Sequence, residues 1–154
     1  ISHLSLIKRK DFKKSNQTRL FLKKVICNEP LFAKLNKKER RKMVQNMYRI
    51  DLKVKETCVK KDEIGSAYFV IELGSLEQWQ HYEYKGKKWS QCVATFSEGY
   101  SFGADSLLFN KNHQHTFKAP EYKSKKSSIA CRIWGLDAEK FHEIRTSMAK
   151  SINQ

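Results

Sequence analysis

The sequence lacks the features of several large protein classes. No run of apolar residues approaches the about 20 that a helix needs to cross a bilayer, and no secretory leader is present. The four cysteines are far apart, which excludes CxxC zinc or redox motifs and does not fit a disulfide-stapled secreted module. We therefore expect four reduced cysteines in an intracellular, cytoplasmic protein without a membrane span.

Catalytic patterns are also missing. The sequence has no Ser/His/Asp arrangement, no paired-carboxylate motif and no glycine-rich loop for a nucleotide triphosphate. We therefore predict no catalytic residues and a domain that is not an enzyme. The first residue is Ile1 rather than methionine, so we expect a piece of a longer polypeptide, with part of the function outside it.

Composition places the chain among globular domains. With 154 residues it has the size of one domain, and 40% apolar and 12% aromatic residues exclude a disordered chain. The net charge of +15 favours anionic partners such as nucleic acid, phosphates, acidic lipid or an acidic protein face. Because the charge is spread along the chain, a solvated lysine-rich surface explains it equally well.

Helical spacing appears first near the N-terminus. Residues 1–16 are polar and basic and are predicted to form an arm, followed by one domain over residues 17–154. Asn36 with Glu39 three residues later is a capping-box pattern, which predicts the start of a second helix. The first helix is predicted from an apolar stripe at helical period: Phe21, Leu22, Val25 and Ile26.

At Tyr48 the apolar period changes from helical to alternating, which indicates strands. Short strands separated by turns indicate an antiparallel sandwich or barrel. A final helix is predicted after Asp137. The fold class is therefore α+β, an antiparallel, jelly-roll-like β-roll with two N-terminal helices, a short internal helix and a C-terminal helix. The predicted strands cover residues 48–55, 57–60, 67–73, 76–82, 90–96, 116–119 and 128–135.

The stretch FSEGYSFGADSLLFN, residues 96–110, concentrates the functional information. Gly103 permits a tight backbone approach, and residues 104–109 are predicted to form one short helix. A glycine followed at once by a helix N-terminus presents unpaired N–H groups, which suit an anion.

Four segments in this order resemble the cyclic-nucleotide-binding domain family. They read LFAKLNKKERRKMVQNM, KETCVKKDEIGSAYFVIELGSLE, EGYSFGADSLLFN and SIACRIWGLDAEKFHEI. The resemblance is to the regulatory domains of cGMP- and cAMP-dependent protein kinases, including protozoan cGMP-dependent kinases. It implies a regulatory, non-catalytic module whose parent chain carries or binds a protein kinase.

In that family the helix opened by the glycine is the phosphate-binding cassette, with the pattern Phe-Gly-Glu-Leu-Ala and then Pro-Arg-Ala-Ala-Thr. The resemblance implies that the closing helix packs on the cassette and moves when the pocket fills, through Leu107, Leu108, Phe141 and Ile144. The nucleotide-binding positions that it implies are Phe102, Gly103, Ala104, Asp105, Ser106, His113, Gln114, His115 and Thr116.

This sequence departs from the family pattern at both charged positions. Ala104 stands at the glutamate that accepts from the ribose hydroxyl, and no arginine follows in NHQHT, residues 112–116. Asp105 does not replace the glutamate, because one helical step turns its side chain by about 100°. At roughly 1.5–3 kcal/mol per charge-assisted bond, losing both weakens binding by about 10²- to 10⁴-fold. A protonated His113 or His115 would recover part of this.

We therefore predict a regulatory module of a cyclic-nucleotide-dependent protein kinase, of the cGMP-dependent type, with a degenerate pocket that binds nucleotide weakly or not at all. The expected partners are neighbouring regulatory or kinase domains of the same or a partner chain. No cofactor or metal is assigned, and cGMP and cAMP remain the possible ligands.

Three alternatives stay open. The pocket could bind cGMP or cAMP through atypical contacts, since the backbone amides after Gly103 remain. His113 and His115 form an HxH pair at an expected strand edge, as in cupin metal sites, although the cupin glycine and glutamate spacings are absent. Bacterial transcription factors share this fold but add a helix-turn-helix after the closing helix, which this sequence lacks, so no specific nucleic-acid binding is predicted.

Overall fold

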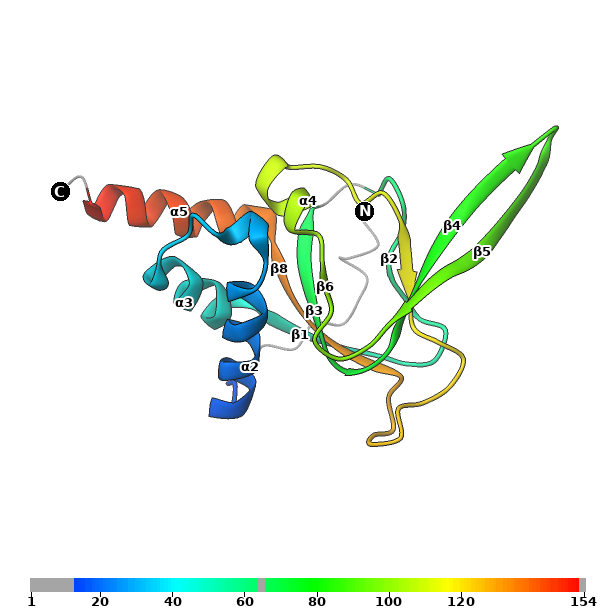
Figure 1. Ribbon diagram of the computed structural model, residues 1–154, viewed down its shortest axis with the longest axis horizontal. Helices are drawn as coiled ribbons and strands as arrows, with labels where there is room; N and C mark the ends of the chain where they lie inside the picture. Colours follow the sequence, from blue (N-terminus) through cyan, green and yellow to red (C-terminus); the bar gives the residue numbers. More distant parts are fainter. Residues whose placement is uncertain (1–12, 64–65, 153–154) are drawn as a thin grey trace.

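Two antiparallel four-stranded sheets form a β-roll, and helices cover one end of it (Figure 1). The computed structural model describes residues 13–63 and 66–152. The helical elements are α2 (Asn16–Cys27), the 3₁₀ turn η1 (Pro30–Phe32), α3 (Lys37–Asn46), α4 (Ala104–Phe109) and α5 (Ala138–Ile152). The strands are β1 (Tyr48–Leu52), β2 (Thr57–Val59), β3 (Ala67–Gly74), β4 (Leu76–Tyr84), β5 (Lys87–Phe96), β6 (Ser101–Phe102), β7 (Thr116–Lys118) and β8 (Cys131–Asp137). The predicted α+β roll with its four helices is confirmed.

Each sheet joins strands that are distant in sequence. One sheet has the order β1-β8-β3-β6, and the other has the order β2-β7-β4-β5. The register of β3 with β6 sets Phe69 opposite Phe102, so the end of β6, the edge strand of the first sheet, is fixed beside β3. The short helix α4 follows β6 directly and therefore starts from a position fixed by this pairing.

The capping box at the start of α3 is present as predicted. The Asn36 side chain accepts a hydrogen bond from the Glu39 amide at 2.8 Å, and Glu39 Oε1 accepts one from the Asn36 amide at 3.1 Å. The other carboxylate oxygen of Glu39 lies 3.4 Å from Arg145 Nε on α5. Glu39 thus caps the N-terminus of α3 and also links α3 to the closing helix α5.

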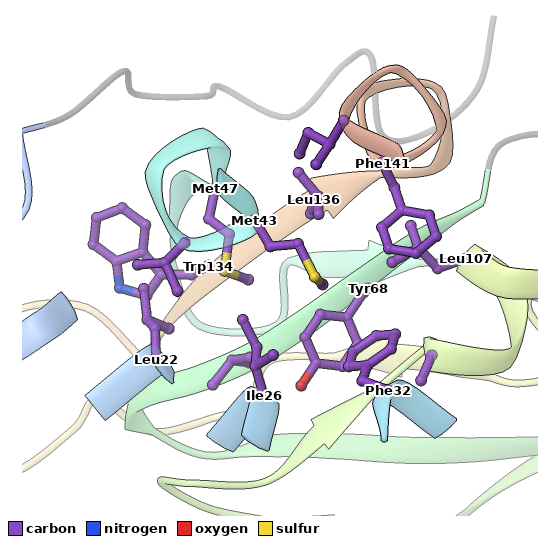
Figure 2. Close-up of a cluster of buried hydrophobic side chains, with 14 of the residues drawn as sticks. Leu22, Ile26, Phe32, Met43, Met47, Tyr68, Leu107, Trp134, Leu136 and Phe141 are labelled. Carbon is purple, nitrogen blue, oxygen red and sulfur yellow. The ribbon is translucent and has the colours of Figure 1, made fainter. Parts of the chain in front are cut away.

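A buried apolar cluster joins the helices to the roll (Figure 2). Helix α2 contributes Leu22 and Ile26 from its predicted apolar stripe, and α3 contributes Met43 together with Met47 at its C-cap. Strands β3 and β8 supply Tyr68, Trp134 and Leu136, while α4 and α5 supply Leu107 and Phe141. Because α4 and α5 share this cluster, the short helix and the closing helix are packed as one unit.

Several strand boundaries differ from the sequence prediction. Strand β1 ends at Leu52, since Val54 lies exposed in a turn and Lys55 has a φ of 65°. Strand β8 begins at Cys131 rather than at residue 128. Strands β4 and β5 extend further than predicted because Lys85 and Gly86, with φ of 49° and 80°, make a two-residue turn that lets pairing continue to its edge.

The hairpin of β4 and β5 projects away from the body of the molecule (Figure 1). Residues 81–93 are all exposed, and beyond Trp79 strand β4 pairs only with β5. Tyr82 and Trp89 face each other across the ribbon with stacked rings 5.4 Å apart. The outer half of the hairpin is thus a two-stranded ribbon held by its own pairing.

Three further expectations concern the N-terminal arm, the cysteines and a membrane span. Most of the predicted arm, residues 1–12, lies outside the described residues. The four cysteines are free, with Cys58 and Cys131 buried. Within the described residues no helix is long and apolar enough to cross a membrane.

Candidate functional site

Gly103 fixes the point where the roll passes into the short helix. It has a φ of +92°, in the left-handed region, and serves as the N-cap of α4 without a side chain. A Cβ on Gly103 would overlap the backbone carbonyl oxygen of Ala67 on β3. Only glycine combines this backbone conformation with such a close approach, so the turn presses the start of α4 against the first sheet.

Helix α4 turns Ala104 and Asp105 to different sides. Ala104, Ser106 and Leu107 are buried, while Asp105 is exposed. The residue that the resemblance aligns with the family's glutamate therefore ends in a methyl group packed into the core cluster. The neighbouring carboxylate faces solvent, in line with the rotation expected from helical geometry.

His113 lies inside the roll, directly behind the glycine turn. Its side chain is buried, its Cε1 lies 3.2 Å from where a Cβ on Gly103 would be, and its ring is 6.0 Å from that of Phe69 and 6.3 Å from that of Phe102. Its backbone carbonyl accepts a hydrogen bond from the Asp62 amide at 2.9 Å. Within the described residues, Nε2 of this ring has no hydrogen-bond partner.

The electrostatics of His113 follow from this position. Burial lowers the pKa of the His113 imidazole, and the carboxylate of Asp105 raises it by a smaller amount. The ring is therefore neutral at pH 7. A neutral imidazole cannot supply the charge that an arginine would supply to a cyclic phosphate.

The next three predicted positions lie in different environments. Gln114 is exposed and donates a hydrogen bond to the Asn112 carbonyl at 3.1 Å. His115 is half-buried, with its ring edge-on to Phe117 at 6.5 Å. Thr116 is buried, and its hydroxyl accepts from the Lys61 amide at 3.1 Å and lies 2.9 Å from His81 Nε2. The structure therefore brings Gly103, His113 and Phe102 together but points Gln114 away.

Sequence reasoning missed the aromatic filling of the roll and the polar link of His81. The rings of Phe102 and Phe117 stack at 3.9 Å, and those of Phe96 and Tyr100 stack at 3.7 Å. His81 bridges Thr116 and Ser90, to which its Nδ1 approaches within 2.7 Å. The alternation of β4 marks His81 as sharing a face with Trp79, but nothing local in the sequence indicates the partner on β7.

The predicted relay residues belong to, or pack against, one buried cluster. Leu107, Phe141 and Ile144 belong to the same buried cluster, and Leu108 is half-buried against it. Phe32 of η1 packs edge-on to Tyr68 at 5.0 Å and lies 6.2 Å from Phe141 (Figure 2). A displacement of α4 would therefore reach α5 through Leu107 and this ring contact; whether α5 moves stays a prediction.

The two histidines of the cupin alternative are not on a strand edge. Both precede β7, which begins at Thr116, and the ring of His113 is enclosed by Phe69 and Phe102. In the part of the chain that the structure describes, no three His, Cys, Asp or Glu side chains come together as metal ligands. Because the intervening chain bends rather than extends, the alternation argument for a shared metal fails.

No protein-family model matches the chain. Among solved structures, it is similar to cAMP-bound PfPKA-R from Plasmodium, with a TM-score of 0.67 and 24% identity over 88% of this chain. It is also similar to the regulatory subunit of a cAMP-independent protein kinase A from Trypanosoma brucei, a triple mutant bound to cAMP, with a TM-score of 0.60 and 18% identity over 86% of this chain. The chain has the cyclic-nucleotide-binding fold.

A third similar structure is the regulatory subunit of a cAMP-independent protein kinase A from Trypanosoma cruzi, bound to guanosine. It matches with a TM-score of 0.59 and 20% identity over 90% of this chain. The chain spans 44% of the length of each of these three structures. At these identities the similarity establishes the cyclic-nucleotide-binding fold and its resemblance to kinase regulatory domains.

Replacing Gly103 by alanine should destabilise the protein strongly. The left-handed backbone costs a non-glycine residue roughly 1–2 kcal/mol, and the overlap with the Ala67 carbonyl adds about 1–3 kcal/mol. Gly99→Ala is the matched control, because Gly99 has the same φ of +92° with open space around it. Urea unfolding should show a loss of about 3 kcal/mol for Gly103→Ala and of only about 1 kcal/mol for Gly99→Ala. Equal losses would contradict the close packing of the turn.

The buried imidazole should titrate at a lower pH than an exposed histidine. NMR titration of the histidine Cε1 protons should give one midpoint below the ordinary value of about 6.5, and that signal should vanish in His113→Gln. Asp105→Asn should lower this midpoint further, because it removes the charge that raises the pKa of His113.

The same pKa shift predicts how stability depends on pH. The unfolded chain takes up this proton near pH 6.5, whereas the folded chain does so only at lower pH, so acidification through this range destabilises the fold. The wild-type protein should therefore lose more stability than His113→Gln on going below pH 6.5. A His113 midpoint above 6.5 would show that the ring can act as a cation in the pocket.

Proposed function

We propose that this domain is the regulatory module of a cyclic-nucleotide-dependent type of protein kinase, of the cGMP-dependent class, with a pocket that binds cyclic nucleotide weakly or not at all. The observation that carries the proposal is the pairing of buried Ala104 with neutral, buried His113. These residues occupy the positions at which the family pattern has a glutamate and an arginine. Neither supplies a charge to a ribose hydroxyl or a phosphate.

The energetic consequence follows from the missing contacts. Two charge-assisted hydrogen bonds contribute together roughly 3–6 kcal/mol, which corresponds to about 10²- to 10⁴-fold in affinity. The amides at the start of α4 are retained, but backbone N–H groups do not replace the two missing charged side chains. Asp105, exposed beside the same helix start, adds repulsion toward an anion.

The module would then act through its packing rather than through ligand binding. Leu107, Phe141 and the ring of Phe32 hold α4 and α5 in one arrangement through the shared cluster. Without a ligand to shift this arrangement, the domain serves as a docking or spacing element for neighbouring regulatory or kinase domains of the same or a partner chain.

A second candidate is a pocket that accepts a ligand lacking the phosphate charge. The neutral interior around His113, Phe102 and Phe117 is compatible with an uncharged nucleoside. The similar Trypanosoma cruzi protein, described as cAMP-independent, is bound to guanosine. A nucleoside needs neither the arginine nor a charged histidine, so this alternative is favoured over cyclic-nucleotide binding by atypical contacts.

Calorimetry with cGMP, cAMP and guanosine separates these functions. We expect millimolar or undetectable affinity for both cyclic nucleotides, because the two charged contacts are missing. Micromolar or tighter binding of cGMP or cAMP would contradict the degenerate pocket. Micromolar binding of guanosine alone would support the second candidate and would contradict a module that acts without a ligand.

Restoring the two side chains tests the alignment of the cassette. Ala104→Glu combined with His113→Arg should strengthen cyclic-nucleotide binding by at least about 10-fold, because it replaces contacts of roughly 1.5–3 kcal/mol each. Ala104→Glu combined with Gln114→Arg is the control, since Gln114 is exposed one position away. Thermal melts should first show that both variants fold. No gain for the first variant, or an equal gain for the control, would mean that the cassette is aligned wrongly.

A further inference from the structure

The positive charge is concentrated on the N-terminal helices. The segment from Lys13 to Met47 contains eleven Lys and Arg residues and two Glu residues, so it carries +9 of the net charge of +15. Both glutamates are engaged locally: Glu29 accepts from the Leu31 amide at 3.1 Å, and Glu39 serves the capping box and Arg145. Neither carboxylate is therefore available to the exposed cations of α2 and α3.

A groove of about 270 Å³ runs between the outer faces of these helices. Its α2 side consists of Arg19, Leu20 and Lys23, and its α3 side of Arg41, Val44 and Gln45. Leu20 is 67% exposed and takes no part in the buried cluster, whereas Val44 is buried and faces the groove from beneath. The groove thus has an apolar base and three cations along its rim.

Arg19, Lys23 and Arg41 have no acidic partner among the residues that the structure describes. Within residues 13–63 and 66–152, no carboxylate lies within ion-pair distance of Arg19, Lys23 or Arg41. The Arg19 guanidinium donates one hydrogen bond to the Asn16 side chain and keeps its other donors. Three cations around an exposed leucine complement a ligand that combines carboxylates with an apolar side chain.

We propose that this groove binds an acidic segment of a partner protein. A leucine or phenylalanine of the segment inserts between Leu20 and Val44, and flanking carboxylates contact Arg19, Lys23 and Arg41. Guanidinium groups match carboxylates in two-point geometry, which favours this pairing at both arginines. The groove lies on the α2–α3 surface and shares no residue with the nucleotide-binding positions that the resemblance implies around Gly103.

The composition of the groove distinguishes this partner from other polyanions. Among the described residues no aromatic side chain lines it, so they offer no stacking surface for bases of a single-stranded nucleic acid. Its volume is below the about 300–1,000 Å³ of sites for small organic ligands, but it accommodates one or two side chains. Its aliphatic base also gives nothing to a phosphate or a lipid headgroup, whereas it complements an apolar residue of a peptide.

Fluorescence polarisation with labelled synthetic peptides tests the proposal on the full chain. The probe is the peptide EELEEFEE, compared with EESEESEE and KKLKKFKK at about 0.15 M salt. We expect the first to bind at least about 10-fold more tightly than the serine peptide, because only it fills the apolar base. The lysine peptide should not bind.

Single substitutions locate the site. Arg41→Glu should weaken the EELEEFEE complex by about 10- to 100-fold, and Leu20→Ser by about 5- to 10-fold. Lys125→Glu makes the same charge change in the loop between β7 and β8, and Val93→Ser removes an exposed aliphatic side chain from β5. Both controls should leave the affinity within about 2-fold. All four substituted residues are exposed, so circular dichroism should show that each variant folds like the wild-type protein.

Three results would overturn the proposal. Equal binding of the serine peptide, or equal weakening by Lys125→Glu and Arg41→Glu, would show that only general charge attraction acts. If a single-stranded oligonucleotide bound more tightly than EELEEFEE, and Arg41→Glu abolished that binding, the groove would be assigned to nucleic acid. If vesicles containing phosphatidylserine bound more tightly than EELEEFEE, and Arg41→Glu abolished that binding, the groove would be assigned to a lipid surface. None of these outcomes depends on whether the pocket behind Gly103 binds a nucleotide.

Discussion

The close contact between Gly103 and the Ala67 carbonyl is the constraint on which the rest of this domain depends. It brings the start of α4 against β3 and leaves room behind it for the ring of His113. Because α4 is only six residues long, its position is determined almost entirely by this contact and by Leu107 in the core. The cassette, the helices and the closing helix α5 are thereby held in a single packed unit.

The interior beside that contact is aromatic and neutral, which sets the chemistry that the roll can offer. Phe102 stacks on Phe117, and His113 remains uncharged because its burial outweighs the field of Asp105. Charge has instead been placed on the outside, on the faces of α2 and α3. The fold thus separates an aromatic centre from a cationic helical surface, and both proposals made above rest on this separation.

Features set by neighbouring residues could be predicted from the sequence, and features set by distant contacts could not. The Asn36–Glu39 capping box, the apolar stripe of α2 and the short helix after Gly103 depend on local spacing, and all three are present. The ends of β1 and of the β4–β5 hairpin were misjudged because backbone conformations at Lys55 and Lys85 decide them. For the site, the cassette positions came from the family resemblance. The enclosure of His113 by Phe69 and Phe102, and its neutral state, depend on tertiary packing that a sequence pattern does not contain.

The outer β4–β5 ribbon has a consequence for how the molecule tolerates change. A two-stranded ribbon is only marginally stable by itself, so its tip can fray and re-form without loosening the roll. The turn at Lys85 and Gly86 faces open space, and lengthening both strands there in step would keep the cross-strand register. This tip is therefore the natural place to splice in a fluorescent reporter or an affinity tag, since insertions succeed where the backbone makes few other contacts.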